Sequence, residues 1–434
     1  MAGTARSGTV STKQARIAKL AKIHQDAQTT LAHHVDLDWM REAFARTRKD
    51  GAVGIDGETA DAYEADLDAN LEALIGRMKS GTYRAPPVKR AHIPKGDGSE
   101  TRPIGIPTFE DKVAQRAIAM LLEPIYEQDF YPFSYGFRPG RSAHQALDAL
   151  MTGVRELGGG WVLDVDVSKF FDTLDHEQLR ELLRKRVGDG VVGRMVGKWL
   201  NAGVLEGGIV HQMDRGTPQG GVISPLLANI YLHEVLDGWW VNEVLPRLRG
   251  RAFLIRYADD FVVVFEDHDD ALRVQEVLPK RFARFGLTLH PTKTRLVPFR
   301  TKKDGSDEPP PGSFDFLGFT HYWGRSRWGS PAILRKTMSS RFSRAMKKLN
   351  MWMRKARHLP VEAQAKTLGQ KLRGHFGYYG IRGNSRAINR FAYETRVLWK
   401  KWLERRSQRA RMTWEAFNRL LAQYPLPPAR LTHP

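Results

Sequence analysis

The stretch AFLIRYADDFVVVF, residues 252–265, constrains the fold more than any other part of the chain. Two short runs of bulky, β-favouring residues flank a brief interruption, which is the pattern of a β-hairpin. The turn holds the adjacent acids Asp259 and Asp260 and has no Gly or Asn, although a tight two-residue turn favours positive φ. Two carboxylates among so much hydrocarbon are costly to keep ionised unless a positive charge lies beside them. The stretch therefore predicts a divalent-cation site with oxygen ligands or, as the simpler alternative, a surface turn that happens to hold two acids.

A second acidic strand occurs far upstream of this hairpin. Residues 161–167, WVLDVDV, alternate apolar residues with Asp164 and Asp166, which predicts a strand with both acids on one face. Asp166 stands near the end of that strand, where the fold could bring it to Asp259 and Asp260. The alternative is a helix cap or a solvated strand residue.

Two segments combine cations with turn residues. PPVKRAHIPKGDGSETRPIGIP predicts a hairpin in which Lys95 and Arg102 flank the turn and could clamp a triphosphate. SYGFRPGRS predicts a loop that allows close backbone approach to a polynucleotide, with Arg138 and Arg141 on phosphates. Solvated cations in the first segment and a purely structural turn in the second remain open as alternatives.

The positive charge of the chain is concentrated at one end. Residues 331–434 hold 24 Lys and Arg against four Glu, whereas the first 330 residues hold 44 basic and 44 acidic groups. This separation predicts a surface that binds polyanions, most simply nucleic acid, with an anionic membrane surface as the rival. The helices expected in this basic region span residues 336–355, 361–378 and 385–407. Their Trp residues are expected in the core, and exposed cations such as Lys347, Lys348 and Arg354 are expected to bind RNA.

Other classes of protein are disfavoured by simple features. No apolar run approaches the roughly 20 residues that cross a bilayer, and the N-terminus has no apolar signal core. The absence of Cys excludes disulfides and thiolate-zinc modules and suits a reducing compartment. We expect no membrane partner and a cytoplasmic, prokaryotic location.

The order of the motifs resembles a known family. PKGDGSETRPIGIP, SYGFRPGRSAHQAL, DVDVSKFF, RGTPQGGVISPLLANIYL, YADD, GLTLHPTKT and FDFLGF follow one another as the motif blocks of reverse transcriptases do. The blocks are most similar to those of the enzymes encoded by bacterial group II introns. The basic C-terminal region, with RGHFGYYG, resembles the thumb and maturase region of that group.

The resemblance implies an α+β fold, organised as a right-hand polymerase. It has helical and hairpin fingers, an antiparallel-sheet palm and an all-α basic thumb. The expected domains are an N-terminal extension at 1–80, fingers and palm at 81–325, the thumb at 326–411 and a short tail at 412–434.

The resemblance also implies RNA-directed DNA synthesis with two Mg²⁺ ions. Asp166 and Asp259 would ligate both ions, with Asp260 beside them and the Val167 carbonyl completing one site.

Other matching positions surround the substrates. Lys95 and Arg102 would hold the triphosphate of the dNTP, and Phe171 would exclude ribonucleotides. The remaining implied contacts are Gln219 and Lys293 at the nucleotide, and Leu317 and Gly318 at the primer.

The implied partners are group II intron RNA, an RNA template with a DNA primer, dNTPs and target DNA. The expected role is to assist splicing of the intron and to support its mobility, without the Cys-containing endonuclease of many relatives. Two alternatives stay open. The first is a reverse transcriptase with a host role, in phage defence or repair, and the second is an RNA-binding splicing chaperone whose polymerase is dispensable.

Overall fold

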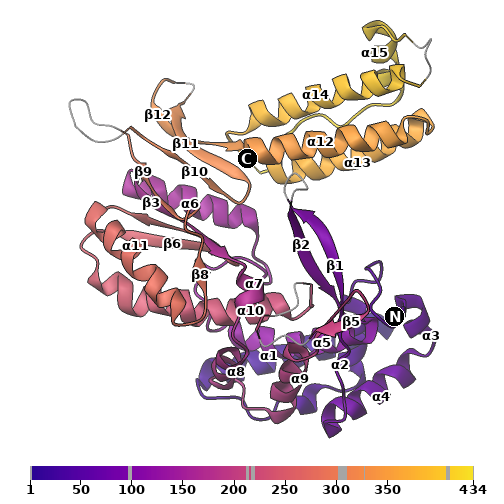
Figure 1. The fold of residues 1–434 in the computed structure, drawn as a ribbon, viewed down its shortest axis with the longest axis vertical. Helices are drawn as coiled ribbons and strands as arrows, with labels where there is room; N and C mark the ends of the chain where they lie inside the picture. The colour runs from indigo at the N-terminus through magenta and orange to yellow at the C-terminus, as the bar shows by residue number, and fades with distance from the viewer. Residues whose placement is uncertain are drawn as a thin grey trace. The chain divides into compact units, whose positions relative to one another are not determined.

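The computed structural model describes residues 2–95, 100–211, 215–216, 220–301, 310–326, 328–406 and 411–433. The chain forms two compact units, which are described one at a time. The first comprises Met1–Leu150 and Leu163–Leu296, and the second comprises Met151–Val162 and Val297–Pro434. Both contain helices and strands (Figure 1), which confirms the predicted α+β class at the level of mixed secondary structure. Across the described residues, none of the helices combines the length and apolar character that a membrane crossing requires.

Helix α5 (Phe109–Tyr126) is the centre of the helical part of the first unit. It packs against α1 (Ala2–Ile23), α2 (Leu37–Arg46) and α10 (Ser224–Leu232). Most of its side chains are buried, including the polar Asp111 and Gln115. The Trp39 indole of α2 donates a hydrogen bond to the Ala117 carbonyl at 3.0 Å.

The other helices of the first unit surround this centre. Helices α3 and α4 follow one another with only Asp66 between them, and α4 ends at Gly81 with a φ of 84°, as a glycine C-cap does. The bounds are Ala60–Ala65 for α3, Leu67–Ser80 for α4, His176–Arg184 for α8, Gly190–Leu200 for α9 and His268–Ala283 for α11. Helix α6 (Ala143–Leu157) begins in the first unit and ends in the second.

A five-stranded sheet contains both acidic segments. Its order is β6-β7-β3-β8, with β9 also paired to β3, and α11 packs against β7 and β8 (Figure 1). The predicted hairpin over residues 252–265 is confirmed, because β6 and β7 pair antiparallel around a two-residue loop. The bounds are Gly160–Ser168 for β3, Ala252–Tyr257 for β6, Asp260–Phe265 for β7, Thr288–Leu289 for β8 and Arg295–Phe299 for β9.

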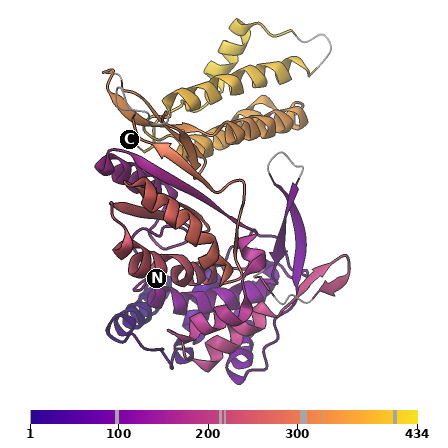
Figure 2. The ribbon, with the colours of Figure 1, turned by 60° about the vertical axis from the view of Figure 1, so that its left-hand side comes forward.

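A second sheet of the first unit has the order β2-β1-β4-β5. Strands β1 (Val88–Lys95) and β2 (Glu100–Ile106) form the hairpin that was predicted around Gly96–Gly98, and they can be followed in Figures 1 and 2. The turn itself, residues 96–99, lies outside the described residues. Strands β4 (Val204–Glu206) and β5 (Ile209–His211) extend this sheet.

The second unit has a three-stranded antiparallel sheet with the order β10-β11-β12. Its strands are β10 (Ser313–Phe316), β11 (Phe319–Arg325) and β12 (Pro331–Thr337). The prediction that a helix begins at Lys336 is wrong, because Lys336 pairs with Thr320 in the sheet. The adjacent residues Ile333 and Leu334 and the alternating burial along β12 are typical of a strand with one covered face. The helix begins after Met338.

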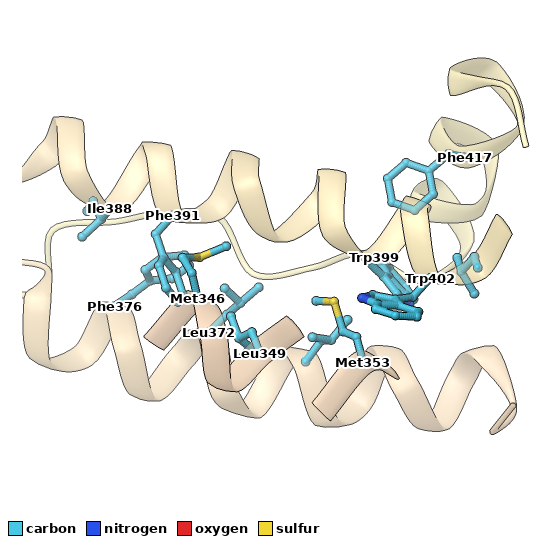
Figure 3. Close-up of a cluster of buried hydrophobic side chains, with 12 residues drawn as sticks. Met346, Leu349, Met353, Leu372, Phe376, Ile388, Phe391, Trp399, Trp402 and Phe417 are labelled. Carbon is cyan, nitrogen blue, oxygen red and sulfur yellow. The ribbon is translucent and has the colours of Figure 1, made fainter. Parts of the chain in front are cut away.

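Three basic helices follow the sheet and enclose an apolar core. Their bounds are Ser339–Ala356 for α12, Val361–Tyr379 for α13 and Ser385–Glu404 for α14. Figure 3 shows side chains from all three helices meeting between them. Trp399 and Trp402 are buried, and their indole groups donate to Gln364 at 3.0 Å and Asn350 at 2.8 Å. These tryptophans are therefore core residues, as predicted.

The segment after residue 411 joins the same core. Helix α15 (Trp414–Gln423) buries Phe417 against Trp399, with ring centroids 5.7 Å apart (Figure 3). The chain then returns to the end of α13, where the backbone N–H groups of Thr432 and His433 donate to the Gly380 carbonyl at 2.7 and 3.0 Å. The domain boundaries predicted at 325 and 411 stay predictions, but the residues after 411 share a core with the helices before them.

Truncation of Phe417 tests this shared core. Phe417→Ala removes a fully buried ring, and we expect the free energy of unfolding to fall by about 3–5 kcal/mol. The measurement is chemical denaturation of the full chain. The matched control is Tyr393→Ala, whose ring is 65% exposed and whose loss is expected to change stability by about 0.5 kcal/mol or less. Equal effects of the two substitutions would contradict a packed C-terminal segment.

Candidate active site

The turn between β6 and β7 presents Asp259 from a strained backbone. Ala258 has a φ of 57°, a left-handed conformation that is unusual for a residue with a Cβ, and it is 4% exposed. The missing glycine in this turn is thus replaced by an alanine held in the conformation that the turn requires. Gly136 packs against it, since a Cβ at position 136 would lie 2.3 Å from the Ala258 nitrogen. Asp260 begins β7 and pairs with Tyr257.

The sheet brings Asp166 into electrostatic contact with Asp259. Burial raises the pKa of the Asp259 carboxyl, and the negative charge of Asp166 raises it further. Asp166 lies on β3, and its carboxylate is 3.2 Å from the Lys293 Nζ atom. The Asp166 carbonyl also accepts the backbone N–H of His290 at 2.7 Å, which places the Lys293 segment beside β3. Two acids that are distant in sequence therefore share one site.

The two acids suit a magnesium ion that the protein binds only in part, with water and substrate as its other ligands. Within the described residues, no three His, Asp or Glu side chains are grouped closely enough to hold a metal. Mg²⁺ is usually bound through one or two carboxylates, with water and substrate phosphates as the other ligands. Asp166 and Asp259 supply two such carboxylates, and burial together with the negative charge of Asp166 raises the pKa of the Asp259 carboxyl.

Arg102 is the predicted triphosphate ligand whose side chain the structure describes. It pairs with Ile93 in the β1–β2 hairpin, its side chain is exposed, and its charge lowers the pKa of Asp259. Burial raises the pKa of Asp172, and Arg102 counteracts that shift as well. The positive charge of Arg102 therefore acts on the carboxylates of both Asp259 and Asp172.

The other predicted nucleotide contacts are described unevenly. Lys95 ends β1 opposite Glu100, but its side chain lies outside the described residues, as does the whole of Gln219. Phe171 lies in α7 (Phe170–Thr173), is half-buried, and meets the Phe170 ring edge-on with centroids 5.3 Å apart. Lys169, just before this helix, has a φ of 46° and turns the chain directly after β3.

The two predicted arginines of the SYGFRPGRS loop have different environments. Arg138 is buried, and its guanidinium donates to both carboxylate oxygens of Glu127 at 2.9 and 2.8 Å and to the carbonyls of Tyr131 and Ser134. Its side chain is 4% exposed, so its hydrogen bonds hold the loop and leave little of it for a template phosphate. Arg141 is exposed and lies over the Tyr135 ring at 5.4 Å, where a strand could reach it.

The remaining predicted positions belong to the second unit. Leu317 and Gly318 connect β10 to β11 with φ values of 49° and 83°, and the Tyr378 hydroxyl donates to the Leu317 carbonyl at 2.8 Å. Lys347, Lys348 and Arg354 are exposed on α12. Both sets stay predictions as nucleic-acid contacts.

A buried ion pair beside the β6–β7 turn is absent from the sequence-based predictions. Arg256 and Asp237 both have fully buried side chains and form two hydrogen bonds, Nε to Oδ1 at 2.8 Å and Nη2 to Oδ2 at 2.5 Å. The Arg256 Nη1 atom donates to the Ala258 carbonyl at 3.1 Å and to Asn229 at 2.9 Å, and Asn229 donates to the Gly136 carbonyl at 2.7 Å. The network thus holds the carbonyl groups of Gly136 and Ala258, the two residues whose backbones approach each other closely.

One signal in the sequence could have identified this network. Arg256 is a lone charge inside the apolar strand AFLIRY, and a charge in such a place requires a buried partner. The partner could not be chosen from sequence, because Asp237 lies in a π-helical segment, His233–Gly238. Such widened turns are rare and often occur near functional sites.

Comparison with known proteins agrees with this geometry. The model of the family described as reverse transcriptase (RNA-dependent DNA polymerase) matches residues 93–321, more than half of the chain, including Asp166, Asp259 and Asp260. This chain belongs to the reverse transcriptase family. It is therefore an RNA-directed DNA polymerase with nucleic acids as partners, and polymerase domains of this family generally use Mg²⁺.

The reverse transcriptase is similar to several curated proteins. Protein YkfC of Escherichia coli (strain K12) is 34% identical over 328 residues, which are 68% of this chain and 84% of that protein. The group II intron-encoded protein LtrA of Lactococcus lactis subsp. cremoris is 43% identical over 183 residues, 42% of this chain and 30% of LtrA. The putative COX1/OXI3 intron 2 protein of Saccharomyces cerevisiae is 26% identical over 378 residues, 75% of this chain and 41% of that protein. The matched part of this reverse transcriptase thus spans less than half the length of these two intron-related proteins.

Removal of Arg256 tests the support of the turn. Arg256→Met leaves the Asp237 carboxylate buried without its partner, and we expect a loss of about 3–5 kcal/mol in the free energy of unfolding. Arg256→Lys is also expected to impair primer extension, because an ammonium cannot form the two parallel hydrogen bonds. Denaturation and primer extension below the melting temperature measure the two effects.

Arg251→Met is the matched control for this substitution. It removes an arginine of the same hairpin region that pairs with Glu266 at the surface, where its side chain is 63% exposed. Exposed pairs contribute about 0–1 kcal/mol, so the control is expected to be nearly neutral. Arg256→Met behaving like Arg251→Met would show that the buried pair does not support the turn.

Proposed function

We propose that this reverse transcriptase extends a DNA primer on an RNA template with two Mg²⁺ ions held by Asp166 and Asp259. The observation that carries the proposal is that Asp166 lies on β3 and Asp259 in the turn that leads into the neighbouring strand β7, both within the family-matched region. The charge of Asp166 accordingly raises the pKa of Asp259. The Val167 carbonyl and the Asp260 carboxylate are the proposed additional oxygen ligands. When bound, the ions lower the pKa of the primer 3′-hydroxyl and neutralise the charge of the departing pyrophosphate.

The residues around the acids bind and orient the incoming dNTP in this proposal. Arg102 holds the triphosphate, together with Lys95 across the hairpin. Phe171 forms a wall at the sugar and excludes a 2′-hydroxyl, and Gln219 lines the nucleotide pocket. Lys293, which pairs with Asp166, places a further positive charge near the reacting phosphates.

The polymerase architecture assigns a role to each part of the fold. We assign the five-stranded sheet to the palm, the β1–β2 hairpin with its neighbouring helices to the fingers, and α12–α14 to the thumb. The support for this assignment is that both acids lie on the sheet, whereas the three helices are strongly basic. Primer and template contacts are proposed for Arg141, Leu317 and Gly318, with Arg138 stabilising its loop.

We further propose that the basic helices bind a group II intron RNA and that the protein assists splicing and supports mobility into target DNA. Lys347, Lys348 and Arg354 are exposed on α12 with no ion pair to any described carboxylate, so they are available for RNA phosphates. The similarity to LtrA, whose printed description is a group II intron-encoded protein, supports this role.

Replacement of Asp259 tests the catalytic proposal. Asp259→Ala removes a metal ligand, and we expect primer extension to fall by at least about 100-fold while RNA affinity changes by less than about twofold. The measurement is extension on an RNA template with Mg²⁺, with dNTPs and rNTPs compared. Asp269→Ala, an exposed acid on α11, is the control and is expected to retain activity. Extension by Asp259→Ala at the wild-type rate would refute the assignment.

Charge reversal on α12 tests the RNA-binding proposal. Lys347→Glu, Lys348→Glu and Arg354→Glu together are expected to weaken RNA binding at least about tenfold. The salt dependence is also expected to become shallower, because each lost phosphate contact removes roughly 0.7–0.9 from the slope of log K against log salt. Filter binding over a series of salt concentrations measures both effects.

The control for this variant reverses three exposed cations of the first unit, Arg247, Lys280 and Arg284. It changes the net charge equally but leaves α12 intact. If both triple variants lost the same affinity, binding would follow net charge alone, and the proposed role of α12 would be wrong.

A further inference from the structure

A hollow of about 540 Å³ lies in the first unit, formed by residues outside the polymerase site described above. Its walls come from the segment between α4 and β1, from α8 and α9, and from the β4–β5 hairpin. The charged residues that line it are Arg84, Arg180, Arg194 and Lys198, and no Asp or Glu lines it. The first 330 residues have balanced charges, so a cavity whose charged lining residues are all cations is a local departure from the surrounding composition.

Arg180 is the residue of the hollow that has an unsatisfied hydrogen-bond donor. Its Nε atom is buried and has no hydrogen-bond partner, and its Nη2 atom has only a long contact, 3.5 Å, with the Gly197 carbonyl. Two arginines of the first unit that are more deeply buried are paired, Arg138 with Glu127 and Arg186 with Asp129, although the buried Nε atoms of Arg90 and Arg116 also have no hydrogen-bond partner. A buried donor without a partner costs about 1–3 kcal/mol, and such a group calls for an explanation.

The other cations of the hollow are also available to a ligand. Arg84 and Arg194 are exposed and form no ion pair with any carboxylate of the described residues. Lys198 is held in place, because its ammonium donates to the carbonyls of Gly81, at 2.6 Å, and Tyr83. The carbonyl groups do not neutralise the charge of Lys198, so the four cations together give the hollow a positive potential.

Nearby acids do not satisfy Arg180. An adjoining hollow shares Arg180 and Asn201 and is also lined by Asp175 and Glu177. Asp175 is occupied as the cap of α8, where its Oδ1 atom accepts the backbone N–H groups of Glu177 and Gln178 at 3.0 Å. Glu177 is exposed and forms no ion pair with Arg180.

We propose that this hollow binds a backbone phosphate of an RNA strand at a point away from the site of nucleotide addition. A phosphodiester would supply the acceptor oxygens that Arg180 lacks, and the planar guanidinium groups suit bidentate contacts with phosphate. The uncharged walls, formed by residues such as Pro87, Ala202 and Val210, provide an apolar surface for a neighbouring sugar or base. Val210 is 47% exposed, so the hollow opens to solvent where a strand can pass.

Neutralising the two central arginines tests the site. For Arg180→Gln with Arg194→Gln, we expect the affinity for a 40-nucleotide single-stranded RNA to fall by about 3–30-fold. The salt slope should become smaller by about 0.7–1.4, the value for one or two lost phosphate contacts with a single strand. The control, Lys280→Gln with Arg284→Gln, loses the same charge on α11 outside the hollow and is expected to change affinity by less than about twofold. An unchanged salt slope in the Arg180 and Arg194 variant would overturn the proposal.

A cross-linking experiment separates direct contact from a general loss of folding. A photoreactive benzoyl-phenylalanine in place of Val210 is expected to cross-link the same RNA in an otherwise wild-type chain. The yield should fall at least about fivefold when Arg180→Gln and Arg194→Gln are added, with the thermal unfolding curve unchanged. Absence of any cross-link would overturn the proposal. So would a result in which inorganic pyrophosphate stabilises the wild type through these arginines while RNA binding ignores them, because the ligand would then be a small phosphate compound.

This inference rests on the proposed function only for the identity of the polymer. The binding experiments contain no primer and no dNTPs, so they do not depend on polymerase activity. Failure of wild-type primer extension would count against the proposed function, whereas an unchanged salt slope would count against the hollow alone.

Discussion

The buried ion pair between Arg256 and Asp237 is the interaction on which the β6–β7 turn and its Asp259 depend. It places a positive charge under a turn that carries two acids, and it reaches the strained Ala258 through a hydrogen bond to its carbonyl. An alanine at a φ of 57° persists only where the surroundings define its conformation more strongly than its own preference. Because both charges are completely buried, each is stable only in the presence of the other. The position of Asp259 is therefore set by residues that do not touch the substrate.

Two unbalanced charges in the first unit have the same physical origin. Asp259 is half-buried and feels the charge of another carboxylate, and Arg180 has a buried N–H group without an acceptor. Each arrangement is unfavourable for the protein alone and becomes favourable when a ligand of opposite charge binds. The first suits a cation that chelates a triphosphate, and the second suits a phosphate. Both features agree with a polymerase whose substrates are polyanions.

Local patterns were sufficient for much of the fold. The hairpin around Asp259, the β1–β2 hairpin and the core position of Trp399 follow from side-chain periodicity, because these elements bury one face or one stripe. The predicted helix start at Lys336 failed, since a short strand pairing with a neighbour outweighs the helical preference of a basic segment. Arg138 was expected on phosphate but faces Glu127, and no rule of sequence spacing distinguishes a solvated arginine from a buried one.

The sequence by itself determined the chemistry of this protein: the acids, their order along the chain, and the separation of a neutral front from a basic end. The tertiary structure decided which of those groups meet. It brought Asp166 to Asp259, paired Arg256 with Asp237, and left the Nε atom of Arg180 without a hydrogen-bond partner. The physical reason is that electrostatic energies depend on distance and burial, and neither is a property of a residue's position in the sequence.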